Sequence, residues 1–421
     1  MAVSEWEWAP GTPVDHTVKI IKFHRDSLAV PQEQRVRLAD PSRHDFPIGL
    51  DESDRKFPVP SQAPSWSERV MGSLLAGAVG DALGAPIEFL SIESIRGQHG
   101  PEGVTGPGAS GLITDDTQMT LFTLEGLIRA HVRDRVSGPG DPLPIVQHAY
   151  QRWLHTQGVE WPQAGGPFAE RVPHPDGWLI TERGLFEVAA PGNTCLSALR
   201  KFAAGSPPGT FTNRINDSKG CGGVMRAAPA ALWSADPVEV FSLGAATAAL
   251  THSHPTGYIS AGALAFLVHG LLTSSSLPAA IAALTRVLQR WAGHEEQLAA
   301  LERAVRLADE GRVSPERIAE ELGGGWIGEE ALAIAVYAML VTDTLADALL
   351  VSVNHSGDSD STGAICGNLA GALYGVRSIP ADWLDRLELR QVITTLGEDA
   401  LTEFSAHPPT EDRWVQRYPS W

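Results

Sequence analysis

Two short acidic segments contain the residues best suited to chemistry in this 421-residue sequence. The first runs from Thr114 to Thr117 and reads T-D-D-T, and the second runs from Asp358 to Thr362 and reads D-S-D-S-T. Adjacent carboxylates repel each other unless a cation lies between them. Sets of carboxylate and hydroxyl oxygens are typical ligands of hard cations such as Mg²⁺ or Mn²⁺. The residue types therefore indicate a metal site.

A helix cap is the alternative interpretation of both segments, because each directly precedes a helical pattern. Ser, Thr and Asp side chains accept hydrogen bonds from the free N–H groups of a first turn, and negative charge there favours the helix dipole. One such residue is enough for a cap, whereas each segment offers several. The residues alone leave both interpretations open.

Two known motifs resemble the second segment, but the residues after it exclude both. An EF-hand loop that began at Asp358 would need an acidic ligand at its twelfth position, which is Leu369. The nucleophile motif of haloacid-dehalogenase phosphatases also matches D-S-D-S-T, but a doubly wound sheet must come after it. The rest of the chain, 363–421, is mostly helical in pattern and too short for that sheet.

Other positions are weaker candidates on their own. Glu88 follows Pro86 in apolar surroundings, where a carboxylate is either a surface residue or a catalytic acid. The glycine-rich stretch 220–226 either brings backbone N–H groups close to a ligand or forms an ordinary turn. His252 and His254 could be zinc ligands, but no third nitrogen or sulfur ligand lies at helical spacing, so packing or substrate stacking is the better interpretation. Cys221 lacks a neighbouring base, so we do not expect a nucleophile.

Helices must position these residues, because apolar side chains recur at helical spacing through most of the chain after residue 63. We expect an all-α fold in one large domain, almost without strands. The glycines at 72–84 predict close approach of helices rather than a dinucleotide-binding loop, since no strand precedes them. The other expected helices are 117–134, 227–233, 237–251, 257–273, 277–293, 294–311, 329–342 and 361–376.

The two ends of the sequence differ from this helical region. Residues 1–64 mix charge, proline and isolated aromatic residues, with one short strand predicted at 18–23. They predict either a partner-binding arm or lid, or a flexible tail. The main domain is predicted at 65–405, and 406–421 is predicted to be a C-terminal tail.

Composition limits the classes of partner. The chain carries 32 Lys and Arg against 50 Asp and Glu, a formal net charge of −18. That field repels phosphate backbones and anionic lipid, so we expect neither nucleic acid nor a membrane as a partner. Three cysteines, with no visible secretory or membrane-spanning segment, predict a reducing, cytoplasmic location without disulfides.

Five segments, taken together and in order, resemble the ADP-ribosylglycohydrolase family. They are GSLLAGAVGDALGAPIEF, TDDTQMTLFTLEGL, KGCGGVMRAAPAAL, ALTHSHPTGYISAGAL and SGDSDSTGAICGNLAGALYG. They span most of the chain outside its two ends. The resemblance implies a compact, single-domain, all-α fold with a centre of two metal ions, usually Mg²⁺, with Mn²⁺ as the alternative.

The family's motifs map residue by residue onto this sequence. The implied metal ligands come from both acidic segments, namely Thr114, Asp115, Asp116, Asp358, Asp360 and Ser361. The implied catalytic residues are Glu88, on a loop near the metals, together with Asp115 and Asp360. The implied substrate contacts come from the glycine loop and from the histidine after an L-T pair, namely Gly220, Cys221, Gly222, Gly223 and His252. Many members have Asn at the position of Cys221, a departure that affects a polar contact to ribose or phosphate.

The resemblance implies a magnesium-dependent hydrolase that removes ADP-ribose from modified protein side chains, with ADP-ribosyl-arginine as the expected substrate. Serine-linked or small-molecule ADP-ribose is an alternative substrate. The K-G-C-G-G-V-M-R form is similar to a bacterial subgroup that includes immunity hydrolases against ADP-ribosylating toxins, and residues 1–64 are the candidate toxin-binding arm. A non-catalytic binder of an ADP-ribosylated partner or toxin is the alternative from another functional class.

Overall fold

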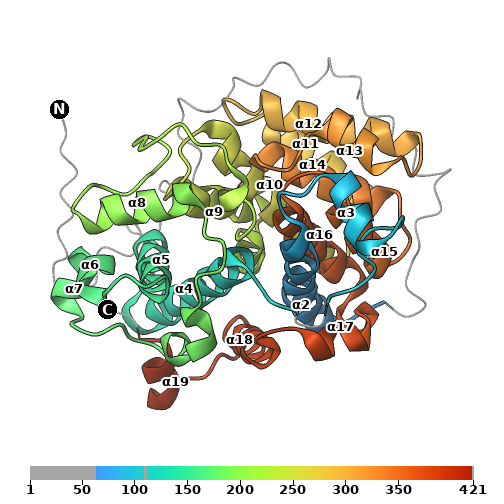
Figure 1. The fold of residues 1–421 in the computed structure, drawn as a ribbon. Helices are drawn as coiled ribbons and strands as arrows, with labels where there is room; N and C mark the ends of the chain where they lie inside the picture. The colour runs from blue at the N-terminus through green and yellow to red at the C-terminus, as the bar shows by residue number, and fades with distance from the viewer. Residues whose placement is uncertain (1–62, 109–110, 420–421) are drawn as a thin grey trace.

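The computed structural model describes residues 63–108 and 111–419, and helices make up the regular structure of that part of the chain (Figure 1). No strand forms within these ranges, where the only β pairing is two isolated bridges, Gly111 to Leu387 and Gly220 to Ile327. The predicted all-α fold is therefore confirmed. The helices of the first half are α2 (Trp66–Gly84), α3 (Ile92–His99), α4 (Asp115–Ser137), α5 (Leu143–Thr156), α6 (Trp161–Ala164), α7 (Pro167–Arg171) and α8 (Asn193–Ala203).

The second half continues in the same way, and its helices follow the predicted ranges within a few residues. They are α9 (Pro237–Ala249), α10 (Pro255–Leu272), α11 (Leu277–Leu288), α12 (Glu295–Asp309), α13 (Pro315–Leu322), α14 (Gly328–Leu340), α15 (Leu345–Val353), α16 (Ser359–Tyr374), α17 (Ala381–Arg386), α18 (Arg390–Glu403) and α19 (Asp412–Arg417).

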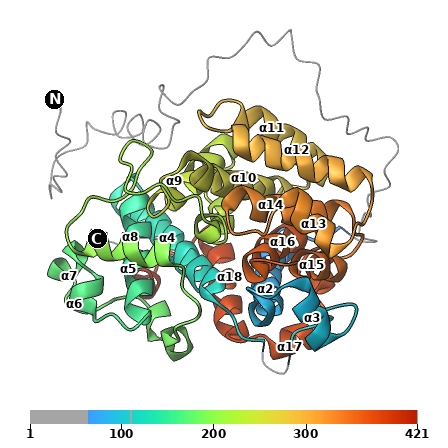
Figure 2. The same cartoon turned by 45° about the horizontal axis from the view of Figure 1, so that its top comes forward.

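Helices α2 and α16 lie side by side (Figures 1 and 2), and the surfaces that meet carry almost no side chains. A Cβ added to Gly80 would lie 2.0 Å from the carbonyl oxygen of Gly363, and one added to Gly371 would lie 2.0 Å from that of Gly72. Only glycine allows two backbones to come this close. The order of the pairs shows that the helices run antiparallel, so the end of α2 meets the start of α16. We call this contact the glycine seam; it also includes Ala76, Gly84, Ser359 and Gly367.

Local signals set where these two helices begin and end. Helix α2 starts with a capping box, in which the Glu68 N–H donates to Ser65 Oγ (3.3 Å) and the Ser65 N–H donates to the Glu68 carboxylate (2.8 Å). After that first turn, almost every residue of α2 is buried. Helix α16 ends at Gly375, whose φ of 78° lies in the left-handed region that favours glycine.

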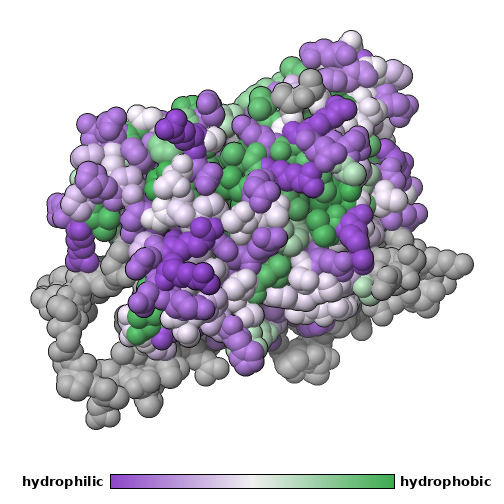
Figure 3. Space-filling model, turned by 90° about the horizontal axis from the view of Figure 1, so that it is seen from below, coloured by the Kyte–Doolittle hydropathy of each residue, from purple (hydrophilic) through white to green (hydrophobic). Residues whose placement is uncertain are grey.

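Two helical segments are long and apolar enough to cross a membrane by composition, namely Trp66–Ile87 and Pro255–Leu272. In each of them, 83% of the apolar window is buried inside the fold. They are packed as core helices are, with α10 lying against α9 and α14. On the face seen from below, apolar side chains gather between hydrophilic ones (Figure 3), as on most protein surfaces.

Three predicted segments differ from the structure or lie outside it. The helix expected at 227–233 is a short 3₁₀ helix, η7 (Ala228–Leu232), a geometry common in brief connections. Helix α11 ends before 293, because the chain turns there and buries Trp291 in the core. The strand expected at 18–23, and nearly all of the extension 1–64, lie outside the described residues.

The C-terminal segment 406–421, which we expected to be a tail, contacts the fold as far as it is described. It contains α19, and the Tyr418 side chain is fully buried. The Tyr418 hydroxyl donates to Asp399 (2.5 Å), and Arg129 of α4 donates to the carbonyl oxygen of Pro419 (2.8 Å). These bonds tie the end of the described chain to α18 and α4.

The glycine seam predicts a strong dependence of stability on single methyl groups. A Cβ at Gly367 would lie 2.0 Å from the Ala76 carbonyl oxygen, so Gly367→Ala should lower the free energy of unfolding by about 1–3 kcal/mol or more in urea titrations. The matched control is Gly97→Ala in α3, where nothing lies within 4 Å of the added Cβ. That change should be neutral or stabilising by about 0.5–1 kcal/mol. Equal stability of the two variants would contradict the close approach.

Candidate metal centre

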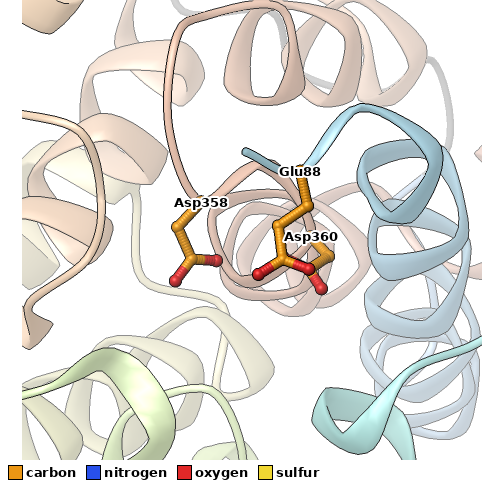
Figure 4. Close-up of side chains that lie close together, drawn as sticks. All are labelled: Glu88, Asp358 and Asp360. Carbon is orange, nitrogen blue, oxygen red and sulfur yellow. The ribbon is translucent and has the colours of Figure 1, made fainter. Parts of the chain in front are cut away.

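Three carboxylates converge where the glycine seam ends. Glu88, Asp358 and Asp360 each offer one oxygen, and these oxygens lie within 4.8 Å of one another (Figure 4). Glu88 follows η3 (Ala85–Ile87), which continues α2, whereas the two aspartates begin α16. Asp358 and Asp360 are buried, and Glu88 is half-buried. We call these three residues the carboxylate triad.

Backbone hydrogen bonds fix the segments that carry the triad. The Glu88 N–H donates to the Gly84 carbonyl (3.0 Å), and the Asp358 N–H donates to the Gly324 carbonyl (2.8 Å). The Ser361 N–H donates to Oδ1 of both Asp358 (3.2 Å) and Asp360 (3.0 Å). Asp358 is therefore the N-cap of α16, and it contributes to the triad at the same time.

The first acidic segment starts α4, and Asp81 of α2 anchors it. The Thr114 N–H donates to both carboxylate oxygens of Asp81 (3.1 and 3.0 Å), and the Thr117 N–H donates to one of them (3.1 Å). Thr114 in turn caps α4 by accepting from the Asp116 N–H (3.3 Å). Asp115 Oδ2 accepts from a backbone N–H at 192 (3.1 Å). The start of α4 is thus bound to the same helix that leads to Glu88.

Burial raises the pKa of the carboxyl groups that join the two segments. Loss of solvation, with the charge of Asp360 as the next cause, raises the pKa of Asp81 to about 7. The same two causes raise the pKa of Glu88 to about 8. Burial and the neighbouring negative charge therefore both favour the protonated forms of these two groups, relative to an exposed carboxylate.

The same environment raises the pKa of three further acidic side chains. Burial is the largest cause that raises the pKa well above its usual value in Asp115, Asp116 and Asp358, and the charge of Asp360 adds to it in all three. The carboxyl groups of two segments that are distant in the sequence therefore interact electrostatically. We call the whole set the acidic cluster: Asp81, Glu88, Asp115, Asp116, Asp358 and Asp360.

The donor set of the acidic cluster fits divalent cations. Among residues 63–108 and 111–419, no Lys or Arg forms an ion pair with any of the six carboxylates. Oδ1 of Asp116 is buried without a hydrogen-bond partner there, which is costly unless a cation meets it. Carboxylates beside the hydroxyls of Thr114 and Ser361 are the oxygen ligands that Mg²⁺ and Mn²⁺ prefer. Asp115 and Asp116 lie outside the 4.8 Å triad, but the charge of Asp360 acts on both of them.

The glycine loop, residues 220–226, places Cys221 at the edge of the triad. Its turn is η6 (Cys221–Gly223), where the Cys221 thiol donates to Oδ2 of Asp358 (2.8 Å) and the Cys221 N–H donates to the Trp326 carbonyl (3.2 Å). Burial, and then the nearby charge of Asp358, raise the pKa of this thiol well above its usual range. Cys221 has no neighbouring base in the sequence, whereas the structure places the Asp358 carboxylate beside the thiol. The raised pKa favours the protonated thiol, which acts here as a hydrogen-bond donor.

His252 lies against the glycine loop and is almost fully buried. A Cβ at Gly222 would lie 3.2 Å from His252 Cε1, and His252 Nδ1 lies 2.9 Å from Thr251 Oγ1. Burial lowers the pKa of His252 to about 3, so its ring is neutral. Arg226 donates to the same Thr251 hydroxyl (2.6 Å) and lies over the ring of Tyr150 (4.3 Å). Arg226 thus supports the loop from inside.

The structure adds residues that the sequence analysis overlooked. Asp81 lies within the stretch 72–84, from which we expect only a close approach of helices. A carboxylate inside an apolar, glycine-rich helix needs buried partners, and this is a usable signal. Phe89 and Trp326 stack on each other beside Glu88, with ring centroids 5.1 Å apart. Their positions in the sequence carried no sign that they meet.

Comparisons with known proteins agree with this geometry. The sequence model of the family described as ADP-ribosylglycohydrolase matches residues 62–410. The chain is 29% identical over 334 residues to the ADP-ribosyl-[dinitrogen reductase] glycohydrolase of Rhodospirillum rubrum, and the aligned region covers 78% of this chain and 92% of that protein. It is 25% identical over 332 residues to the ADP-ribosylarginine hydrolase Tri1 of Serratia proteamaculans strain 568, and the aligned region covers 79% of this chain and 78% of that protein.

The fold is also similar to that of a solved structure, described as an ADP-ribosylglycohydrolase-related protein complex. The two superpose with a TM-score of 0.54 at 25% sequence identity, over 81% of this chain and 99% of that one. The family match spans most of the chain and includes both acidic segments, the glycine loop and His252. This chain therefore belongs to the ADP-ribosylglycohydrolase family.

Proposed function

We propose that this chain is a divalent-cation-dependent hydrolase that removes ADP-ribose from modified protein side chains. The acidic cluster carries the proposal, because buried carboxylates from two distant segments meet without a compensating Lys or Arg in the described chain. Family membership supplies the reaction class. Mg²⁺ is the proposed cation, and Mn²⁺ suits the same oxygen ligands.

Each acidic segment contributes to the proposed binding of two cations. The residues that would hold them are Thr114, Asp115, Asp116, Asp358, Asp360 and Ser361. Bound there, the cations supply positive charge that offsets the carboxylates and polarises the ribose hydroxyls next to the bond that breaks. The backbone N–H groups of the glycine loop, with Cys221 and His252, are proposed to orient the rest of the ADP-ribose.

Glu88 is the proposed proton donor. Water adds to the anomeric carbon of the ribose, the bond from that carbon to the side-chain nitrogen breaks, and the departing nitrogen takes up a proton. Burial is the largest cause that raises the pKa of Glu88, and it favours the protonated form that a proton donor requires. Asp115 or Asp360 is proposed to accept the proton that the water releases. General acid–base catalysis of this kind contributes on the order of 10²–10⁴-fold to the rate.

Arginine is the proposed acceptor, supported by the relative named as an ADP-ribosylarginine hydrolase. Serine-linked and small-molecule ADP-ribose remain alternative substrates to be screened beside it. Immunity against a toxin through residues 1–64 also stays a proposal, since that extension lies almost wholly outside the described residues. We propose a cytoplasmic location, and the described cysteines, Cys195, Cys221 and Cys366, are all free.

The metal ligands give the first functional prediction. Asp116→Asn should lower Mg²⁺-dependent release of ADP-ribose from arginine-modified protein by more than about 10²-fold, since even indirect partners of metal ligands commonly contribute 10–100-fold. Calorimetry should show weaker Mg²⁺ binding by the same variant. Asp385→Asn is the control, because that side chain is 71% exposed and should leave both quantities unchanged. Wild-type protein that binds the modified substrate in Mg²⁺ without releasing ADP-ribose would support the non-catalytic binder instead.

The raised pKa values of Asp81 and Glu88 also link cation binding to pH. Both groups bind protons more tightly in the folded protein, so the metal-free protein should lose stability as the pH rises from about 4 to about 8. Cations offset the charge that develops over this range. Scanning calorimetry should therefore show a larger gain in melting temperature from Mg²⁺, relative to a chelator, at pH 8 than at pH 5. The same gain at both pH values would contradict cation binding at the acidic cluster.

A further inference from the structure

Two aromatic side chains stack on each other at the edge of the acidic cluster. The ring centroids of Phe89 and Trp326 lie 5.1 Å apart, and the ring planes are inclined by 25°. The Phe89 residue is nevertheless 71% exposed, and Trp326 is 42% exposed. Because Trp326 covers only one face of the Phe89 ring, the opposite face is open to solvent. Large apolar groups gathered on a surface commonly mark a binding site.

Both rings are tied to the acidic cluster through the backbone. Phe89 directly follows Glu88, and its N–H donates to the carbonyl of Gly357 (3.2 Å), the residue before the second acidic segment. The carbonyl of Trp326 accepts from the N–H of Cys221 (3.2 Å), whose thiol contacts that same segment. The aromatic pair is therefore held beside Glu88 from two directions.

The backbone of Phe89 is strained in this arrangement. Its φ of 65° lies in the left-handed region, which non-glycine residues rarely adopt. An exposed phenylalanine in a strained turn is an unfavourable choice for stability alone. Such strain is commonly retained at sites that bind or react.

We propose that the open face of the Phe89–Trp326 pair binds the planar guanidinium group of the ADP-ribosylated arginine, an inference that rests on the proposed function. Cations bind over the faces of Trp and Phe rings, and the flat guanidinium stacks on them. The net charge of −18 favours a cationic ligand over a neutral one.

The position of the aromatic pair indicates that it contacts the acceptor end of the substrate rather than the adenine end. In the proposed reaction the acidic cluster holds the ribose attached to the acceptor, and Glu88, next to Phe89, protonates the departing nitrogen. The adenine is the other flat group of the substrate, but the diphosphate and a second ribose separate it from this bond. Serine-linked ADP-ribose offers no planar cation, so the pair would favour arginine over serine.

Two substitutions at Trp326 test the proposal in the full-length, Mg²⁺-loaded protein. Trp326→Leu keeps apolar bulk but removes the aromatic face, whereas Trp326→Phe keeps an aromatic face. We expect Trp326→Leu to raise KM for an arginine-ADP-ribosylated peptide about three- to thirtyfold, with kcat and the affinity for free ADP-ribose retained. Trp326→Phe should recover most of the loss. Trp66→Leu is the matched control, because Trp66 is also 42% exposed but lies at the opposite end of α2.

The outcomes separate the inference from the function on which it rests. An unchanged KM in Trp326→Leu overturns the inference, and so does a fall in kcat with KM unchanged, because the pair would then only position Glu88. Phe89→Leu should give the same rise in KM and decides the question if Trp326→Leu does not fold. Wild-type protein that releases no ADP-ribose from the arginine peptide overturns the proposed function itself, before any variant is compared.

Discussion

The absence of side chains along the glycine seam is the constraint on which the rest of this structure depends. Because Gly80 and Gly363 bring two backbones into direct contact, α2 and α16 are fixed in both register and distance. The last turn of α2 then leads to Glu88, and the first turn of α16 carries Asp358 and Asp360, so the triad forms where the seam ends. If the two helices packed less closely, the distances between the triad carboxylates would depend on flexible side chains.

This rigidity matters because the acidic cluster opposes folding when no cation is bound. Burial, together with the charge of neighbouring carboxylates, raises the pKa of Asp81, Glu88, Asp115, Asp116 and Asp358. Local hydrogen bonds in the described chain offset part of this cost. The caps supply part of that offset, since Thr114 and Asp358 satisfy N–H groups at the starts of α4 and α16. The cap and metal interpretations of the two segments are therefore compatible, because an aspartate can bind a backbone N–H with one oxygen and offer the other to the site.

The sequence predicted the all-α fold because apolar periodicity and capping residues are local signals. It also indicated both acidic segments, since adjacent carboxylates are unusual whatever the fold. The contact between Asp81 and Thr114 was not predictable in this way, because it depends on how α2 meets α4. The same holds for the thiol of Cys221, whose partner Asp358 becomes its neighbour only through tertiary packing. The extension 1–64 has neither periodicity nor a motif, so its role could not be derived from pattern alone.

The division between helices and loops suggests how one site can serve different acceptors. The proposed metal-binding residues lie on the first turns of α4 and α16, which the seam and Asp81 hold in place. Phe89 and Trp326, in contrast, lie on connections outside the long helices, joined by single backbone hydrogen bonds. Substitutions there would alter the surface that we propose meets the acceptor, while the helix ends keep their spacing. Acceptor preference could therefore vary within this fold without disturbing the carboxylates proposed to hold the ribose, because the two sets of residues depend on different parts of the chain.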